Sequence, residues 1–216
     1  MSTDPPRPDV PSLPRILQIG EPLLRSPARE LAPEEIRSDA VQRLIQRMRD
    51  TMRDAPGVGL AAPQIGEPLQ LAVIEDREEY LRDAEFSWLA ERERAAVPFC
   101  AIVNPKLAVT LADPREFFEG CLSVAGFTAL VPRARAVRVE CLDEHGRPRV
   151  IEARGWHARI LQHEIDHLRG VLYVDRMAPR TLMTTANYAR YWKDHSLDEL
   201  RAALDLVSPS APAPDS

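Results

Sequence analysis

The chain has 216 residues, of which 44% are hydrophobic and 28% charged, as is ordinary for a globular protein with a sizeable core. No stretch approaches the roughly 18 consecutive apolar residues of a membrane-spanning helix, so we expect no membrane partner. The formal net charge of −5 gives no sign of a broad nucleic-acid surface, and we expect no DNA partner.

Both ends of the chain are rich in proline and poor in apolar residues. We predict that residues 1–12 and 208–216 are disordered tails on a single folded domain over 13–207. The N-terminal segment lacks the apolar core of a secretory signal. The cysteines at 100, 121 and 141 are odd in number and widely spaced, which favours a reducing compartment. We therefore expect a cytoplasmic location.

The first half of the chain predicts one helix, an irregular stretch and a strand. Apolar residues recur at helical spacing over Pro33–Asp54, and a proline and a glycine end the pattern. Gly57–Gly66 is too irregular in pattern for a regular element, whereas Leu69–Ile74 is typical of a buried strand. Residues 75–98 form a charged insertion, which we expect to be a surface loop with one short helix.

The middle of the chain predicts strands separated by turns at Asn-Pro (104–105), Asp-Pro (113–114) and Pro-Arg (132–133). The predicted strands are Ala101–Val103, Lys106–Leu111, Arg115–Glu119 and Val137–Leu142. Residues 143–146 (DEHG) indicate a hairpin turn, and Val150–Ala153 would be its return strand.

A helix is predicted over His157–Leu168, with Gly170 as its C-terminal cap. One further helix is expected over either Leu182–Tyr191 or Leu197–Leu206. Strands come first and a helix with functional residues follows, without β-α-β alternation. This order predicts an α+β fold with antiparallel β-sheets around a central helix.

That central helix carries His163-Glu164-Ile165-Asp166-His167, an H-E-x-x-H pattern. Histidines at positions i and i+4 lie about 5–6 Å apart on one helix face and can share one metal ion. Glu164 can then reach a water molecule beside the metal and take up its proton. The pattern therefore predicts a metal-dependent hydrolytic site.

The third metal ligand is open at this point. In one class of metalloprotease a third histidine would stand where this chain has Tyr173, and in another a downstream glutamate, for which Glu199 is the one candidate. Cys121 is the alternative, because a thiolate is stabilised beside a cation. A Cys-ligated hydrolase, a zinc endopeptidase and a non-catalytic metal-binding module all remain possible readings of the pattern.

Three segments together resemble the motifs of the peptide deformylase family. Gly57–Gln64 (GVGLAAPQ) resembles its first motif, Glu119–Ser123 (EGCLS) its second and His163–Leu168 (HEIDHL) its third. The three occur in the family's order, and the resemblance spans roughly Leu13 to Met177. It implies a hydrolase that removes the formyl group from the N-terminal methionine of nascent polypeptides, with transient ribosome contact as a further possible consequence.

The resemblance also implies residue roles. Cys121, His163 and His167 would hold one divalent metal ion, and Glu164 would act as general base and then as acid. The family commonly uses Fe2+ in the cell and works with Zn2+, Ni2+ or Co2+. Ligand spacing alone would suggest Zn2+.

Further roles follow from the same resemblance. The Gln64 side chain and the Leu122 backbone N–H would face the oxygen of the tetrahedral intermediate. The expected substrate-contacting residues are Val58, Gly59, Trp156, Ile160 and, at the rim, Arg159. Glu119 and Arg133 would form an ion pair behind the loop that carries Cys121, called the ligand loop below. The charged insertion is similar to that of the family branch with organellar members, so an organellar location stays open beside the cytoplasmic one.

Overall fold

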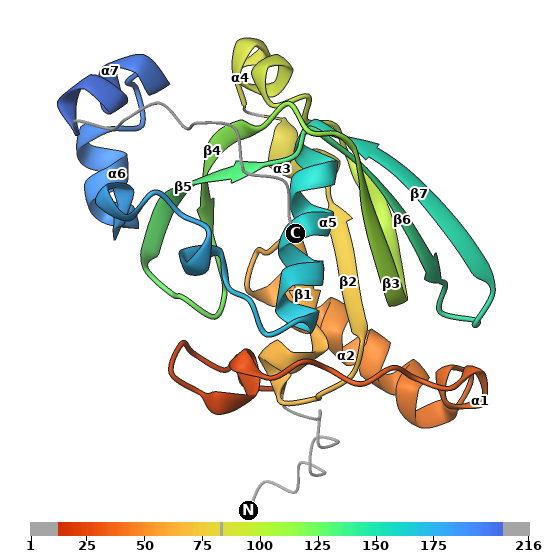
Figure 1. Cartoon of the computed structure of the whole chain (residues 1–216). Coiled ribbons are helices and arrows are strands. Elements are labelled where there is room, and N and C mark those ends of the chain that lie inside the picture. The colour runs from red at the N-terminus through yellow and green to blue at the C-terminus, as the bar shows by residue number, and fades with distance from the viewer. Residues whose placement is uncertain (1–12, 83, 205–216) are drawn as a thin grey trace, which may run out of the picture.

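The computed structural model describes residues 13–82 and 84–204, and its strands form two antiparallel sheets (Figure 1). The larger sheet has the order β1-β2-β3-β6-β7 and the smaller the order β4-β5-β8. The strands are β1 (Gly59–Ala61), β2 (Leu71–Asp76), β3 (Val97–Leu111), β4 (Arg115–Gly120), β5 (Phe127–Arg133), β6 (Ala136–Leu142), β7 (Pro148–Arg154) and β8 (Met183–Thr184). The predicted α+β class with antiparallel sheets is confirmed.

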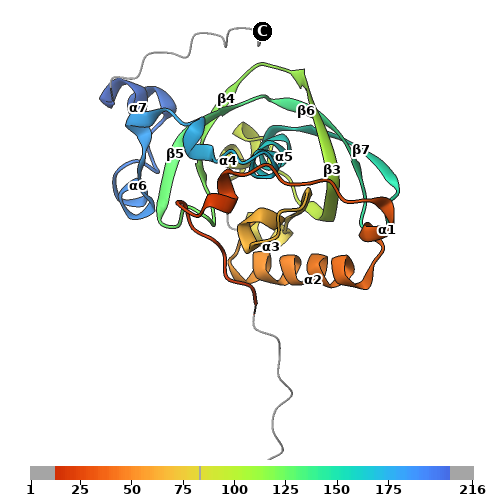
Figure 2. The same ribbon diagram turned by 60° about the horizontal axis from the view of Figure 1, so that its bottom comes forward.

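Two long helices lie on opposite faces of the larger sheet. The α-helices are α1 (Pro33–Ile36), α2 (Asp39–Asp54), α3 (Glu78–Leu81), α4 (Phe86–Glu91), α5 (Gly155–Leu168), α6 (Thr185–Tyr191) and α7 (Leu197–Ala203). The 3-10 helices are η1 (Pro22–Arg25), η2 (Ala62–Ile65), η3 (Tyr173–Asp175) and η4 (Pro179–Thr181). Helix α5 lies between the two sheets, and α2 covers the outer face of β1 and β2 (Figures 1 and 2).

The larger sheet is buried on both faces beside these helices. Side chains alternate along a strand, so Ala72 and Ile74 of β2 join the core around α5, whereas Leu71 and Val73 join the core beneath α2. All four are fully buried. This explains why β2 has a continuous apolar sequence, as predicted, although the strand lies two residues further along the chain than expected.

The Asn-Pro sequence at positions 104 and 105 does not end a strand, contrary to the prediction. Strand β3 continues through it for 15 residues, with a shift of register against β6 between Val103 and Lys106. Asn104 has a φ of +49°, a left-handed conformation that asparagine tolerates well. Its side chain accepts a hydrogen bond from the Leu31 N–H and donates one to the Leu31 carbonyl oxygen. The dipeptide is therefore a bulge anchored from outside the sheet.

Other boundaries also differ from the prediction. The expected helix over Pro33–Asp54 is divided by Ser38, whose hydroxyl accepts a hydrogen bond from the Val41 N–H and so begins a new helix, α2. Strand β5 was not predicted, because Pro132 suggests a turn, yet it pairs with β4 and β8. The stretch Gly57–Gly66 contains β1 and η2.

The C-terminal part has both α6 and α7, where the sequence predicted one or the other. The hairpin turn over 143–146 is confirmed, with β7 as its return strand. The predicted tails, 1–12 and 208–216, lie outside the described residues.

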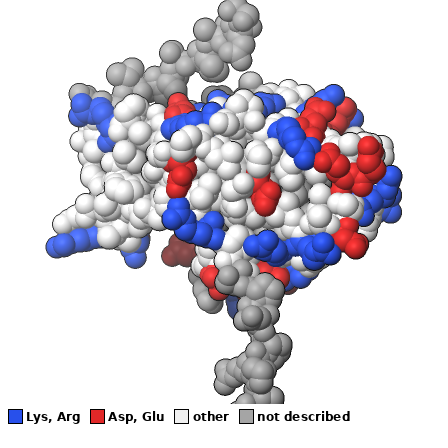
Figure 3. Space-filling model, turned by 90° about the horizontal axis from the view of Figure 1, so that it is seen from below, with Lys and Arg blue, Asp and Glu red and all other residues white. Residues whose placement is uncertain are grey.

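Two observations bear on the expectation that the protein binds neither a membrane nor DNA. Over residues 13–82 and 84–204, no helix is long and apolar enough to cross a membrane. Figure 3 shows acidic and basic side chains interspersed on the face of the described residues that is seen from below, so no extended basic patch covers that face.

Asp76, within the predicted insertion 75–98, is the last residue of β2, and a buried ion pair anchors the later part of the insertion to that strand. The Arg94 guanidinium donates two hydrogen bonds to the Asp76 carboxylate, at 2.8 and 2.9 Å, and Asp76 is fully buried. Arg94 also stacks over the rings of Trp88 and Trp156, 5.3 and 5.1 Å from their centroids. The insertion thus has two short helices, α3 and α4, and one end fixed in the core, whereas the sequence predicted a surface loop with one helix.

We predict that Asp76→Asn destabilises the protein by about 3 kcal/mol or more, because Arg94 would keep a buried charge without its counter-charge. The shift of the urea unfolding midpoint measures the effect. Glu79→Gln, in the exposed Arg77–Glu79 pair of the same insertion, is the matched control and should change stability by less than about 0.5 kcal/mol. Equal effects of the two substitutions would show that Asp76 does not anchor the insertion.

Candidate active site

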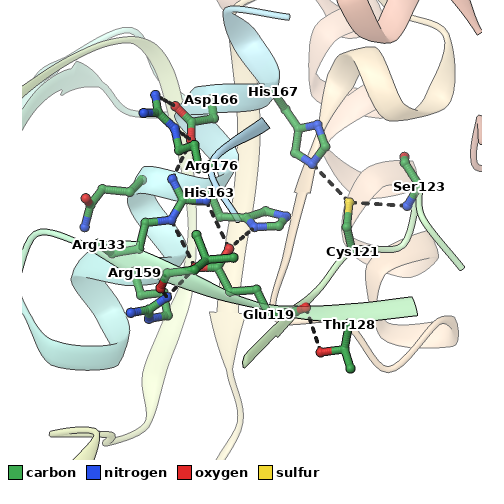
Figure 4. Close-up of polar contacts among 12 residues, drawn as sticks. Glu119, Cys121, Ser123, Thr128, Arg133, Arg159, His163, Asp166, His167 and Arg176 are labelled. Carbon is green, nitrogen blue, oxygen red and sulfur yellow. Dashed lines mark hydrogen bonds and ion pairs between the residues drawn. The ribbon is translucent and has the colours of Figure 1, made fainter. Parts of the chain in front are cut away.

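Helix α5 and the loop after β4 bring three metal-ligating side chains together (Figure 4). His163 and His167 are one helical turn apart, with ring centroids separated by 5.1 Å. The Cys121 sulfur lies 3.2 Å from His167 Nε2. One ligand atom from each of the three residues lies within 4.8 Å of the other two. The sequence thus brings one sulfur and two imidazoles to a common point.

The protonation properties of the two histidines suit a metal site. Burial, followed by the charge of His163, lowers the pKa of His167 well below its usual value, so this imidazole stays neutral and able to ligate. Burial opposes protonation of His163, but Cys121 and Glu119 raise its pKa well above the usual value. The same two groups would stabilise a divalent cation at this point, and a thiolate with two imidazoles suits Zn2+ or Fe2+. The residues therefore fit a divalent metal ion.

Glu119 is the hub of a buried network behind the ligands. It receives two hydrogen bonds of 3.0 Å from Arg133, one of 2.6 Å from Arg159 and one of 2.9 Å from His163 Nδ1. Burial favours its neutral form, but these cationic partners, Arg133 above all, hold the pKa of Glu119 below its usual range. Because His163 is bound through Nδ1, its Nε2 is directed to the ligand cluster. The predicted pairing of Glu119 with Arg133 is present.

The network continues away from the cavity. The other side of the Arg133 guanidinium is paired with Asp166 of α5. Asp166 also accepts two hydrogen bonds from Arg176, at 2.7 and 2.8 Å (Figure 4). The central α5 is thereby joined to β5 and to the segment after η3 through charges on the helix itself.

Glu164 lies beside β1 with almost no spare space. A side chain on Gly59 would place its Cβ 2.1 Å from Glu164 Oε1, so the strand can approach the carboxylate only through a glycine. Burial raises the pKa of Glu164 to about 7. Its Oε2 is buried and has no hydrogen-bond partner within the described part of the chain. A buried carboxyl group with a pKa near neutrality can both accept and release a proton.

Gln64 has a defined orientation. Its Oε1 accepts a hydrogen bond of 2.8 Å from the Ala61 N–H, which turns the NH2 group toward the ligand loop. The NH2 group donates to the Ser123 hydroxyl at 3.1 Å and lies 3.6 Å from the Cys121 sulfur. Gln64 is therefore fixed with its donors facing the same point as the ligand atoms.

A single cavity of about 380 Å³ joins most of the predicted site residues. Those that line it are Val58, Gly59, Gln64, Glu119, Cys121, Leu122, Trp156, Arg159, Ile160, His163 and Glu164. Neither His167 nor Arg133 is among the lining residues. His167 lies behind Cys121, and Arg133 is buried behind Glu119. The predicted rim position of Arg159 is wrong, because the residue is 3% exposed and its guanidinium binds Glu119 and two backbone carbonyls.

Other lining residues were not predicted. Arg94 comes from the insertion, Phe118 and Phe127 from β4 and β5, and Thr185 from the start of α6. None belongs to a motif, and β5 itself was not recognised in the sequence. The hydrophobic character of Phe127, which is 43% exposed, indicates that this side of the cavity can receive an apolar group.

Comparison with known proteins identifies the family. Residues 13–182 match the family model described as polypeptide deformylase. The chain belongs to the peptide deformylase family. It is 42% identical to peptide deformylase 3 of Streptomyces avermitilis over 194 residues, which cover 90% of this chain and 84% of that protein.

A plant relative and a solved structure agree with this assignment. The chain is 48% identical over 176 residues to the chloroplastic peptide deformylase 1A of Solanum lycopersicum; these residues cover 82% of this chain but only 64% of that protein. A Met-Ala-Ser-bound crystal structure of the class I type b peptide deformylase of Acinetobacter baumannii superposes with a TM-score of 0.69. It is 29% identical, and the match covers 77% of this chain and 99% of that one.

We predict that Cys121→Ala weakens the binding of Co2+, used as a spectroscopic probe, by more than the roughly 10–100-fold typical of losing an outer-shell partner. The thiolate-to-cobalt absorption band should also disappear. Cys100→Ala is the matched control, because this buried cysteine lies in the core outside the cluster. An unchanged affinity in Cys121→Ala, with the band retained, would remove Cys121 from the ligand set.

Proposed function

We propose that this chain hydrolyses the formyl amide of N-formyl-methionyl peptides, releasing formate and a free N-terminal amine. The observation that carries the proposal is that, in this family member, two ligating residues, a buried carboxyl group and a fixed amide donor line one cavity. The third ligating residue, His167, lies directly behind Cys121. The domain over 13–207 would act with one divalent metal ion held by Cys121 and by His163 and His167 of the central helix α5.

Glu164 moves the proton in this proposal. A divalent metal bound at the cluster supplies Lewis acidity, which makes water a nucleophile near neutral pH. The Glu164 carboxylate takes the proton from the attacking water and then delivers it to the departing amine nitrogen. Its burial beside Gly59 suits both steps, because the carboxyl group is close to the cavity and titrates near neutrality.

Gln64 and Leu122 stabilise the developing negative charge. The Gln64 NH2 group, held by Ala61, and the backbone N–H of Leu122 donate to the oxygen of the tetrahedral intermediate. Fixed donors of this kind need no reorganisation during the reaction.

The peptide would bind along β1 with its methionine side chain in the apolar part of the cavity. Strand β1 is at the edge of the five-stranded sheet, so its outer side can pair with an extended peptide. Val58, Trp156 and Ile160 line the cavity and would contact the methionine side chain. The Met-Ala-Ser complex of the Acinetobacter baumannii protein supports this substrate class.

The proposal also covers the identity of the metal ion and the cellular location of the protein. We propose Fe2+ as the ion used in the cell and the cytoplasm as the location, although the tomato relative is a chloroplast protein.

The endopeptidase alternative finds no support in the structure. Glu199 accepts hydrogen bonds from the backbone N–H and the hydroxyl of Ser196 at the start of α7, and it is not among the clustered ligands.

Formate release from a short N-formyl-methionyl peptide tests the proposed function. Protein loaded anaerobically with Fe2+ should release formate, and chelated protein should not. Glu164→Ala should keep the metal but lose most turnover, because the proton acceptor is gone. Cleavage of an unformylated peptide without formate release would transfer the site to the protease class. Bound metal with neither activity would indicate a non-catalytic module.

We predict that Gln64→Ala lowers kcat by about 100-fold, the usual loss when one oxyanion donor is removed. Because Gln64 also donates to Ser123, urea unfolding must accompany the kinetics to show that the variant folds. Unchanged kcat in the folded variant would mean that this amide does not contact the intermediate.

A further inference from the structure

The segment before η1 crosses the ligand loop and binds it through the backbone. The Ile19 N–H donates to the Ser123 carbonyl oxygen, and the Leu17 N–H donates to the Gln64 carbonyl oxygen, both at 2.7 Å. Leu17 also packs in the same hydrophobic cluster as Cys121. One short segment thus contacts both halves of the proposed oxyanion site.

Gln18, in the middle of that segment, holds the ligand loop with its side chain. Its Nε2 donates to the Leu122 carbonyl oxygen at 3.0 Å and to the Ile16 carbonyl oxygen at 3.3 Å. Its Oε1 accepts a hydrogen bond of 3.2 Å from the Ala125 N–H. The side chain is therefore a bridge across the loop 122–125. Because Gln18 is exposed, it restrains this loop through its hydrogen bonds and not through close packing.

The carbonyl that Gln18 holds belongs to a peptide unit that contacts the Cys121 sulfur. The Leu122 C=O and the Ser123 N–H form one planar unit, in which they point in opposite directions. The Ser123 N–H lies 3.4 Å from the Cys121 sulfur and donates to it. A rotation of this unit would weaken the hydrogen bond to the sulfur, and Gln18 opposes that rotation from the other side.

We propose that Gln18 is a positioning residue, which fixes the Leu122–Ser123 peptide and through it the hydrogen bond to the Cys121 sulfur. The proposal rests on the proposed function, in which Cys121 ligates the metal and Leu122 donates to the intermediate. Hydrogen bonds to a ligating thiolate tune its donor strength, and outer-shell partners of metal ligands typically contribute about 10–100-fold to affinity or activity.

Gln18→Met tests the proposal, because methionine has similar length and flexibility but lacks the amide. We expect kcat for formate release to fall about 10-fold while KM stays within about twofold. In the Co2+-loaded protein, the thiolate-to-cobalt absorption band should move to longer wavelength, since the sulfur loses a hydrogen bond. A loss of folding stability alone would not move this band.

Two further variants complete the experiment. Gln18→Glu keeps an acceptor for Ala125 but has no donor for Leu122, so it should shift the band as Gln18→Met does. Arg15→Ala is the control, because Arg15 lies on the same segment and pairs only with exposed Glu21 among the described residues. Wild-type kcat and an unshifted band in Gln18→Met, or equal changes in Arg15→Ala, would overturn the proposal.

The absorption band separates this proposal from the proposed function. If wild-type protein released no formate but the band shifted in both Gln18 variants, the proposed deformylase reaction would be wrong, and Gln18 would still be a positioning residue for the Cys121 sulfur. If wild-type protein released formate and neither Gln18 variant changed band or kcat, the reaction would stand and the positioning role would fail.

Discussion

The site depends on one buried carboxylate, that of Glu119. An isolated carboxylate in a protein interior costs several kcal/mol, so the fold must surround it with compensating charges. Arg133 of β5, together with Arg159 and His163 of α5, provides them. The same interaction therefore joins β4, β5 and α5 and sets the orientation of a proposed metal ligand. Loss of either arginine would disturb the packing of α5 and the direction of the His163 ring at once.

The residues that sequence patterns located well are those whose geometry is local. The i and i+4 spacing of His163 and His167 needs only a helix to bring the two rings together, and the apolar spacing over His157–Leu168 predicted that helix to within two residues of α5. The motif around Gln64 and the one around Cys121 could be assigned only by resemblance, since their meeting depends on η2 and on the loop after β4, which are far apart in sequence.

What the sequence could not predict depends on long-range contacts. The burial of Arg159 follows from acceptors on β4 and β5, and no local pattern distinguishes it from an exposed helix arginine. Pro132 suggested a turn because proline is rare within strands, but tertiary pairing overrode that preference in β5. The bridge from Gln18 to Leu122 spans 104 residues and has no sequence signature at all. These features were predicted wrongly or not at all for one reason: the role of each residue is defined by a partner elsewhere in the chain.

The ligand set combines a rigid part and a part that needs support. The two histidines lie on α5, a helix packed between sheets, whereas Cys121 follows β4 on a loop, and loops are intrinsically less well ordered than helices. Precise ligation therefore requires restraints on the loop from other elements. The structure provides them from η2 through Gln64 and from the N-terminal segment through Gln18 and Ile19. We infer that the precision of the site is determined by these contacts on the cysteine side, because the histidine side is already fixed by the core.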